Sequence, residues 1–276
     1  MSPDSAFFLA VALKMAATAA VVVTASMIAE RAGALVGAMV ATLPIAAGPA
    51  YILLALDHDP EFIADSTVAS LAIHSASGIF GMAYVLAAQR GSFPVAIAAA
   101  VGTWFVCALL VRAVPWSLAG AIVFCGAAYA ACVTLAQRFL HARVPPIVRR
   151  WFDIPLRAGL VAILVGIVVA LGANAGPKLT GIFAVFPIVM LSLMLILHPR
   201  IGGPATAAII ANTMWGLVGF AAAVLTLHIA VVPLGAPLAL SAALAVSVGA
   251  NIVIFLVRRR EHAARMRALS RPTMPS

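Results

Sequence analysis

Long apolar stretches, separated by short polar segments, follow one another along the whole chain. Most reach the roughly 20 residues that a helix needs to cross the hydrocarbon core of a bilayer. They do not alternate apolar and polar positions as transmembrane β-strands do, which excludes a β-barrel. The pattern predicts an all-α, polytopic membrane protein with nine helices, at residues 5–29, 33–56, 63–88, 94–113, 115–138, 157–175, 178–198, 204–229 and 234–257.

Two of these helices carry the same proline-broken pattern. In order, the matched pairs are Ala32 and Ala175, Gly33 and Gly176, Ala41 and Ala184, Pro44 and Pro187, and Ile45 and Ile188. A proline inside a helix frees a backbone carbonyl, which lipid cannot satisfy. Two breaks in corresponding places of two repeats point to the binding site of a transporter. Two kinked helices that merely pack together are the alternative.

Charge predicts the orientation of the helices. Charged residues make up 9% of the chain and the net charge is +9. Arginines gather in 137–157 and in the tail from residue 258, and the positive-inside rule places both segments in the cytoplasm. Four predicted spans lie between them, so the N-terminus is expected outside and the C-terminus inside. The charge is thus a topology signal in a bacterial inner (cytoplasmic) membrane, not a surface for nucleic acid.

The two halves are predicted to be inverted with respect to each other. Five spans, an odd number, separate the start of the first repeat from the start of the second. Val114-Pro115 aligns best with Val232-Pro233, so the second half lacks the counterpart of one helix. The expected organisation is a repeat of five helices (1–138), a basic linker (139–156), a repeat of four helices (157–257) and a basic tail (258–276). Such inverted repeats are associated with alternating access.

Few polar residues lie inside the apolar stretches. Lys14 lies about nine residues from the outer end of its helix, so its ammonium can reach the outer interface or serve a functional role. His74 lies closer to mid-membrane. A histidine there can serve as a proton carrier or as a neutral donor to a carbonyl. All eight Asp and Glu residues lie at span ends, in loops or in tails, so a buried acidic proton relay has no residue to form it.

Further candidates lie near the proline breaks or at mid-depth. Thr42 and Ser192 can bond the carbonyls that Pro44 and Pro187 free, or bind a ligand. Asn212 is expected to face the protein interior, because an amide is costly in lipid. Asn251 and His228 are weaker candidates. The predicted substrate-binding residues are therefore Lys14, Thr42, Pro44, His74, Pro187, Ser192 and Asn212.

Neither catalysis nor a cofactor is expected. The chain has no His-Glu-x-x-His helix, no Gly-x-Ser-x-Gly turn and no phosphate-binding loop. The three cysteines lie inside apolar stretches without metal-ligand spacing. The acidic cluster 57–61 is interpreted as a solvated external turn, with a divalent cation site as the alternative.

The segment from Leu179 to Phe220 combines a glycine-containing helix broken at Phe186-Pro187, a polar turn at 198–203 and a second helix. Over these roughly 40 residues it resembles the small bacterial membrane proteins of the GlpM type. The first half, with Leu43-Pro44, is similar but fainter. The resemblance implies a fused double version of such a protein, linked to envelope polysaccharide production. It implies no substrate and no residue roles.

The expected function is a secondary permease or exporter for a small neutral or anionic solute. A cation is disfavoured because no buried carboxylate would balance it. The alternative is an accessory or scaffold subunit of envelope polysaccharide or lipid assembly that moves nothing. A permease needs a solvated cavity lined by residues such as Thr42, His74 and Asn212, whereas a scaffold buries them in helix–helix hydrogen bonds. The coupling ion and homo-oligomerisation stay open.

Overall fold

The computed structural model describes residues 3–31, 47–140, 142, 144–145, 147 and 150–269. These residues form helices and contain no strand. Eight helical segments among them are long and apolar enough to cross a membrane. The chain is therefore a multi-pass, all-helical membrane protein, as its apolar pattern predicts.

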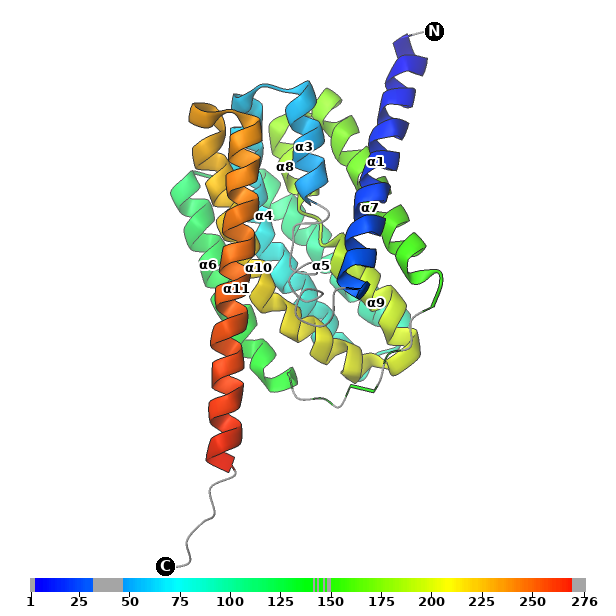
Figure 1. The fold of residues 1–276 in the computed structure, drawn as a ribbon, viewed down its shortest axis with the longest axis vertical. Coiled ribbons are helices and arrows are strands. Elements are labelled where there is room, and N and C mark those ends of the chain that lie inside the picture. The colour runs from blue at the N-terminus through cyan, green and yellow to red at the C-terminus, as the bar shows by residue number, and fades with distance from the viewer. Residues whose placement is uncertain are drawn as a thin grey trace, which may run out of the picture.

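Successive spans run antiparallel through the bundle, and α8 and α9 follow each other within one span (Figure 1). Their bounds are α1 (Pro3–Arg31), α3 (Ala47–Asp57), α4 (Pro60–Ala87), α5 (Phe93–Ala113), α6 (Leu118–Ala136), the short 3₁₀ helix η1 (Gln137–Phe139), α7 (Asp153–Asn174), α8 (Gly176–Ala184), α9 (Ile188–Ile201), α10 (Gly203–Leu234) and α11 (Ala236–Leu269).

Most predicted spans are confirmed to within a few residues, and three differences are informative. Of the predicted helix 33–56, the structure describes only α3, within which Pro49 occupies the first turn and breaks nothing. Helix α10 continues through Pro233 and ends at Leu234, and the Gly235 that follows has a φ of 74°, which suits glycine. Helix α11 continues to Leu269, so much of the predicted tail is helical.

Helix α4 lies at the centre of the bundle. It contacts α5, α6, α8 and α10, and 83% of its apolar window is buried. One core cluster surrounds it, with residues from α5, α6, α9 and α10. A second core cluster joins α1, α3, α7, α10 and α11. Helix α10 is shared by both clusters and so joins the two sides of the bundle.

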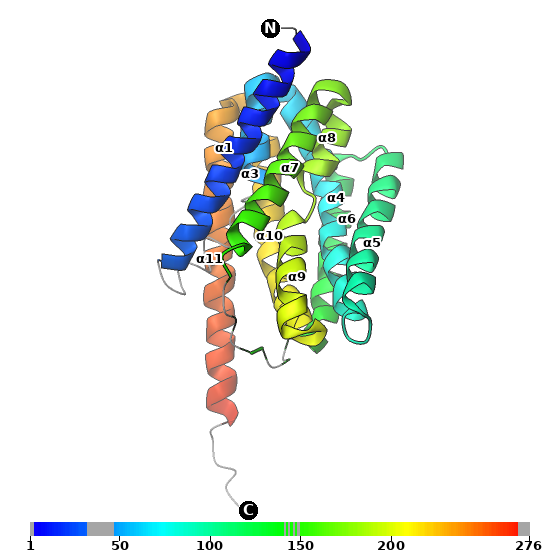
Figure 2. The ribbon, with the colours of Figure 1, turned by 90° about the vertical axis from the view of Figure 1, so that its right-hand side faces the viewer.

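The two ends of the bundle differ in charge. The turn between α3 and α4, which carries Asp57, Asp59 and Glu61, lies at the end where the N-terminus is drawn (Figure 1). The end of α11 and the start of α7 lie toward the opposite end (Figure 2). The last residues of α11 and the first residues of α7 therefore share one end of the bundle.

The predicted break at Pro187 is confirmed. Helix α8 ends at Ala184 and α9 begins at Ile188, and together they form one candidate span, Gly176–Ile201. Figure 2 shows α8 in the upper half of the bundle and α9 in the lower half. The equivalent break at Pro44, and Thr42 beside it, lie outside the described residues.

Candidate functional site

The Pro187 break is enclosed by side chains of two neighbouring helices. On one side, Trp104 of α5 is fully buried, and its ring centroid lies 4.6 Å from that of Phe186. On the other side lies α4, and a Cβ added to Gly181 would overlap the backbone carbonyl of Ser66. Only glycine permits this approach of α8 to α4.

Serines of α4 satisfy carbonyls at the end of α8. Ser70 Oγ donates to the carbonyl of Gly181 at 2.6 Å, and Ser77 Oγ donates to that of Val185 at 3.4 Å. Because the Ser70 proton is used in this way, the 2.5 Å contact between Ser70 Oγ and Tyr51 Oη has the tyrosine as donor. The carbonyls that lipid cannot satisfy are thus covered by protein.

His74 connects α4 to α10. Its Nε2 lies 2.9 Å from the carbonyl of Leu217 and must donate, since a carbonyl only accepts. Its ring lies 4.9 Å from those of Tyr129 and Phe220, and Tyr129 Oη donates to the His74 carbonyl at 3.0 Å. The buried Nδ1 has no hydrogen-bond partner among the described residues. In the structure, His74 thus joins α4 to α10 through a bond to a backbone carbonyl.

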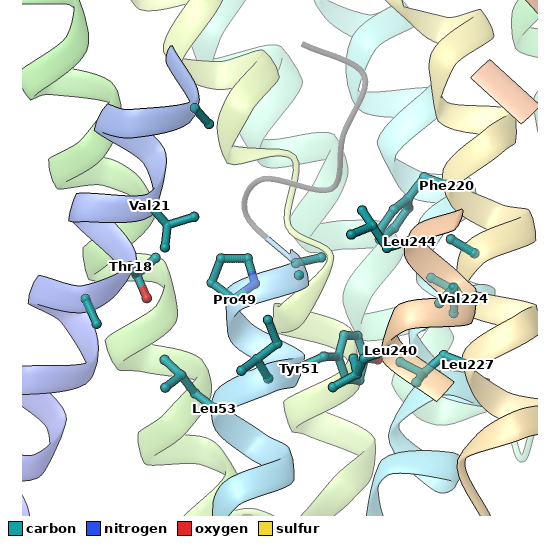
Figure 3. A pocket seen from close by; sticks show the side chains of 17 residues that line it. Thr18, Val21, Pro49, Tyr51, Leu53, Phe220, Val224, Leu227, Leu240 and Leu244 are labelled. Atoms are coloured by element: carbon teal, nitrogen blue, oxygen red, sulfur yellow. The ribbon is translucent and has the colours of Figure 1, made fainter. Parts of the chain in front are cut away.

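A cavity of about 350 Å³ lies beside this core, between α1, α3, α10 and α11 (Figure 3). Figure 3 shows Thr18 and Val21 on one side, Pro49 and Tyr51 in the middle, and Phe220 and Leu244 on the other. Its lining is almost wholly apolar, and among the described lining residues the side-chain polar groups are the hydroxyls of Thr18 and Tyr51. No acidic or basic residue is among the described lining residues.

The cavity is separated from the polar residues that the sequence singled out. Phe220 lines the cavity and lies between it and His74, whose ring it contacts edge-on. The Tyr51 hydroxyl bonds Ser70, and Thr18 Oγ1 donates to the Lys14 carbonyl at 2.9 Å. The hydroxyls on the lining are thus already engaged, and the space is apolar in character.

Other predicted site residues do not line this cavity. Lys14 pairs with Asp57, the last residue of α3. Ser192 is buried, and its hydroxyl donates to Val189 within its own helix at 2.7 Å. Pro187 is not among the lining residues.

Asn212, which is expected to face the protein interior, is not buried. The Asn212 side chain is exposed, and its amide donates to the Ala208 carbonyl one turn earlier at 2.8 Å. This bond within its own helix satisfies part of the hydrogen-bonding capacity of the amide. His228 bonds Thr67 of α4 at 3.0 Å, so it joins helices and does not line the cavity.

Sequence reasoning missed two features of this region. The first is the serine face of α4, whose spacing of four and seven residues over Ser66, Ser70 and Ser77 repeats helically and is a usable signal. The second is the ion pair of Arg200 with Asp153, since neither residue lies in an apolar interior. Among the described residues, no group of three His, Cys, Asp or Glu could hold a metal ion.

No family model, curated protein or solved structure matches the chain. The resemblance to GlpM-type proteins therefore stays a prediction.

Proposed function

We propose that the protein is a secondary permease for a small neutral or anionic solute with a large apolar part. The observation that carries this proposal is the cavity between α1, α3, α10 and α11, because two of these helices come from each half of the chain. Its volume lies at the lower end of the range of small-molecule sites. A movement of one half against the other would change access to a site between them.

The lining supports an apolar solute and disfavours an organic cation. No described lining residue is a carboxylate, and an unpaired charge is costly in an apolar site. Charged groups lie one turn from Thr18, where Lys14 pairs with Asp57. The apolar body of a solute would occupy the cavity, and any polar group would face one of its ends.

Helix contacts support inverted repeats. Helix α1 packs on α7, and α4 packs on α10. The second pair is antiparallel along its length, because Thr67 contacts His228 near one end and Ala88 lies against Gly203 near the other. Equivalent helices that meet in antiparallel pairs are what a two-fold axis in the membrane plane produces.

The same contacts favour α5 as the counterpart of α11. Helix α9 contacts α5, and α3, which occupies the equivalent place in the first half, contacts α11. Inversion also requires the two counterparts to run in opposite directions, and α6 runs in the same direction as α11 (Figure 1). In this proposal α6 is the extra helix, and the match of Val114-Pro115 with Val232-Pro233 does not relate the repeats.

Transport measured in proteoliposomes tests the proposal. The panel consists of one alkyl or aryl body carrying a carboxylate, an amide or an amine. We expect the carboxylate or the amide to be moved and the amine to be excluded. Ala223→Leu, which fills the cavity, should abolish the movement, whereas Ala127→Leu on the exposed face of α6 should not. Transport of the amine alone would contradict the proposal.

A scaffold is the second candidate, and a specific observation favours it. His74, Ser70 and Ser77 all bond other helices and do not line the cavity, which is the arrangement expected of a protein that only holds a complex together. If no member of the panel moves although the protein is folded, the scaffold becomes the better proposal.

We place the N-terminus outside and the C-terminus in the cytoplasm of a bacterial inner membrane. A fluorescent protein fused after Ser276, or inserted at Pro145, should fluoresce, and alkaline phosphatase at the same sites should stay inactive. Phosphatase activity at either site would contradict both the orientation and the inverted repeats.

A further inference from the structure

Two ion pairs tie helices together at opposite ends of the bundle. Lys14 of α1 pairs with Asp57, the last residue of α3. Arg200, near the end of α9, pairs through two nitrogens with Asp153, the first residue of α7, and Nη1 lies 2.8 Å from Oδ2. The end of α3 and the end of α9 lie at opposite ends in Figure 2.

The two ion pairs occupy equivalent places in the two repeats. The offset of 143 residues that relates Pro44 to Pro187 also relates Asp57 to Arg200 and Lys14 to Arg157. Asp153 lies one helical turn before Arg157, on the same face of α7. In each repeat, an ion pair therefore joins the first helix to the far end of the proline-broken helix. The acidic and the basic partner are exchanged between the two repeats.

The outer ion pair adjoins the cavity. The carbonyl of Lys14 accepts the hydroxyl of Thr18, which lines the cavity. Asp57 follows Leu53, another lining residue, by one turn of α3. Breaking the pair would release two walls of the cavity, α1 and α3, from each other at that end.

We propose that these ion pairs are the two gates of the solute route, and that opening one favours closure of the other. This inference rests on the proposed function. Both pairs are formed in the structure, which corresponds to an occluded state between the two open ones. Only an interaction that differs between the two open states can shift their populations, and each ion pair has this property.

The two gates differ in strength. The side chains of Arg200 and Asp153 are 11% and 14% exposed, and the guanidinium also lies 5.2 Å above the ring of Phe152. Those of Lys14 and Asp57 are 16% and 41% exposed. Bidentate, shielded pairs are stronger than single exposed ones. The outer gate is therefore the one that opens more readily, and salt should weaken it more than the inner one.

Cysteine labelling tests the gates without knowledge of the solute. Leu53→Cys is introduced after Cys107, Cys125 and Cys132 have been replaced by alanine. The protein is reconstituted in one orientation, and a membrane-impermeant maleimide is added from the side of the acidic turn. The labelling rate then reports how often the cavity is open to that side.

Asp57→Asn should raise the labelling rate about fivefold, and Arg200→Gln, which opens the opposite gate, should lower it by a similar factor. The exchanged pair, Lys14→Asp with Asp57→Lys, should restore the parental rate and shows that the variants fold. Glu61→Gln, a change to an exposed carboxylate in the same acidic turn, serves as the matched control and should leave the rate unchanged.

Two outcomes would overturn the inference: equal labelling rates in all variants, or rates that shift in the same direction in Asp57→Asn and Arg200→Gln. Either would show that the ion pairs only hold the helices together and do not open. The permease proposal fails separately. If labelling follows the expected pattern but no solute of the panel moves, the gates stand and the proposed solute class falls. If transport continues while labelling is flat, the permease stands without these gates.

Discussion

Around α4, buried polar side chains bond the backbone of neighbouring helices, whereas the cavity beside it carries only two described hydroxyls, and neither is left for a solute. Ser70, Ser77 and His74 each bond a backbone carbonyl of another helix. At the cavity, Thr18 bonds its own helix and Tyr51 directs its hydroxyl toward Ser70. The difference shows that the polar groups of α4 join helices, and that the open space beside them is apolar.

The largest effect is expected where α4 and α8 approach most closely. Gly181→Ala should lower the free energy of unfolding by about 3 kcal/mol, because its Cβ would overlap the Ser66 backbone, which cannot move as a side chain can. Unfolding in mixed micelles by titration with SDS measures the change. Gly126→Ala on α6, where the added methyl meets nothing within 4 Å, is the control and should be neutral or slightly stabilising. Equal stability of the two variants would contradict the close contact.

Smaller effects on stability are expected from alanine-to-leucine substitutions, which we compare between the α4 core and the cavity. Ala76→Leu adds three carbons to a fully buried position of the α4 core and should cost about 2 kcal/mol. Ala223→Leu adds them to the cavity and should cost less than about 0.5 kcal/mol. Thermal stability in detergent, followed by size-exclusion chromatography with fluorescence detection, compares them. If Ala223→Leu is the more damaging of the two, the space is not available for a solute.

The smallest expected difference in the free energy of unfolding is between Ser70 and Tyr51, which belong to one chain of hydrogen bonds. Ser70→Ala leaves the Gly181 carbonyl without its donor and the Tyr51 hydroxyl without its acceptor, and should cost about 2 kcal/mol. Tyr51→Phe removes only the first donor of the chain and should cost about 1 kcal/mol. The SDS titration resolves this difference. A larger cost for Tyr51→Phe would show that Tyr51, and not Ser70, is the residue that the chain depends on.

The helices and the Pro187 break could be predicted because both are local properties. An apolar stretch of 20 residues and a proline within it are visible in any short window. The helices are apolar on most of their faces, however, so the pattern does not say which side of a helix points inward. That is why Asn212 was expected inside and lies exposed.

The contacts of the site could not be predicted, because they join distant parts of the chain. Leu217 follows His74 by 143 residues, and Gly181 follows Ser70 by 111. No local pattern reports such a pairing. The repeat offset did contain a longer-range signal, the correspondence of Asp57 with Arg200, which extends the proline match beyond the broken helices.

The packing of α1 has a consequence for how the protein is made. Only 11% of the apolar window of α1 is buried, and its main described partner is α7, where Met15 lies against Gly166. Those residues are separated by about 150 positions, so at a synthesis rate of about 5–20 residues per second α1 waits roughly 8–30 seconds for its partner to emerge from the ribosome. During that interval the insertion machinery or the surrounding lipid must hold the first helix in place.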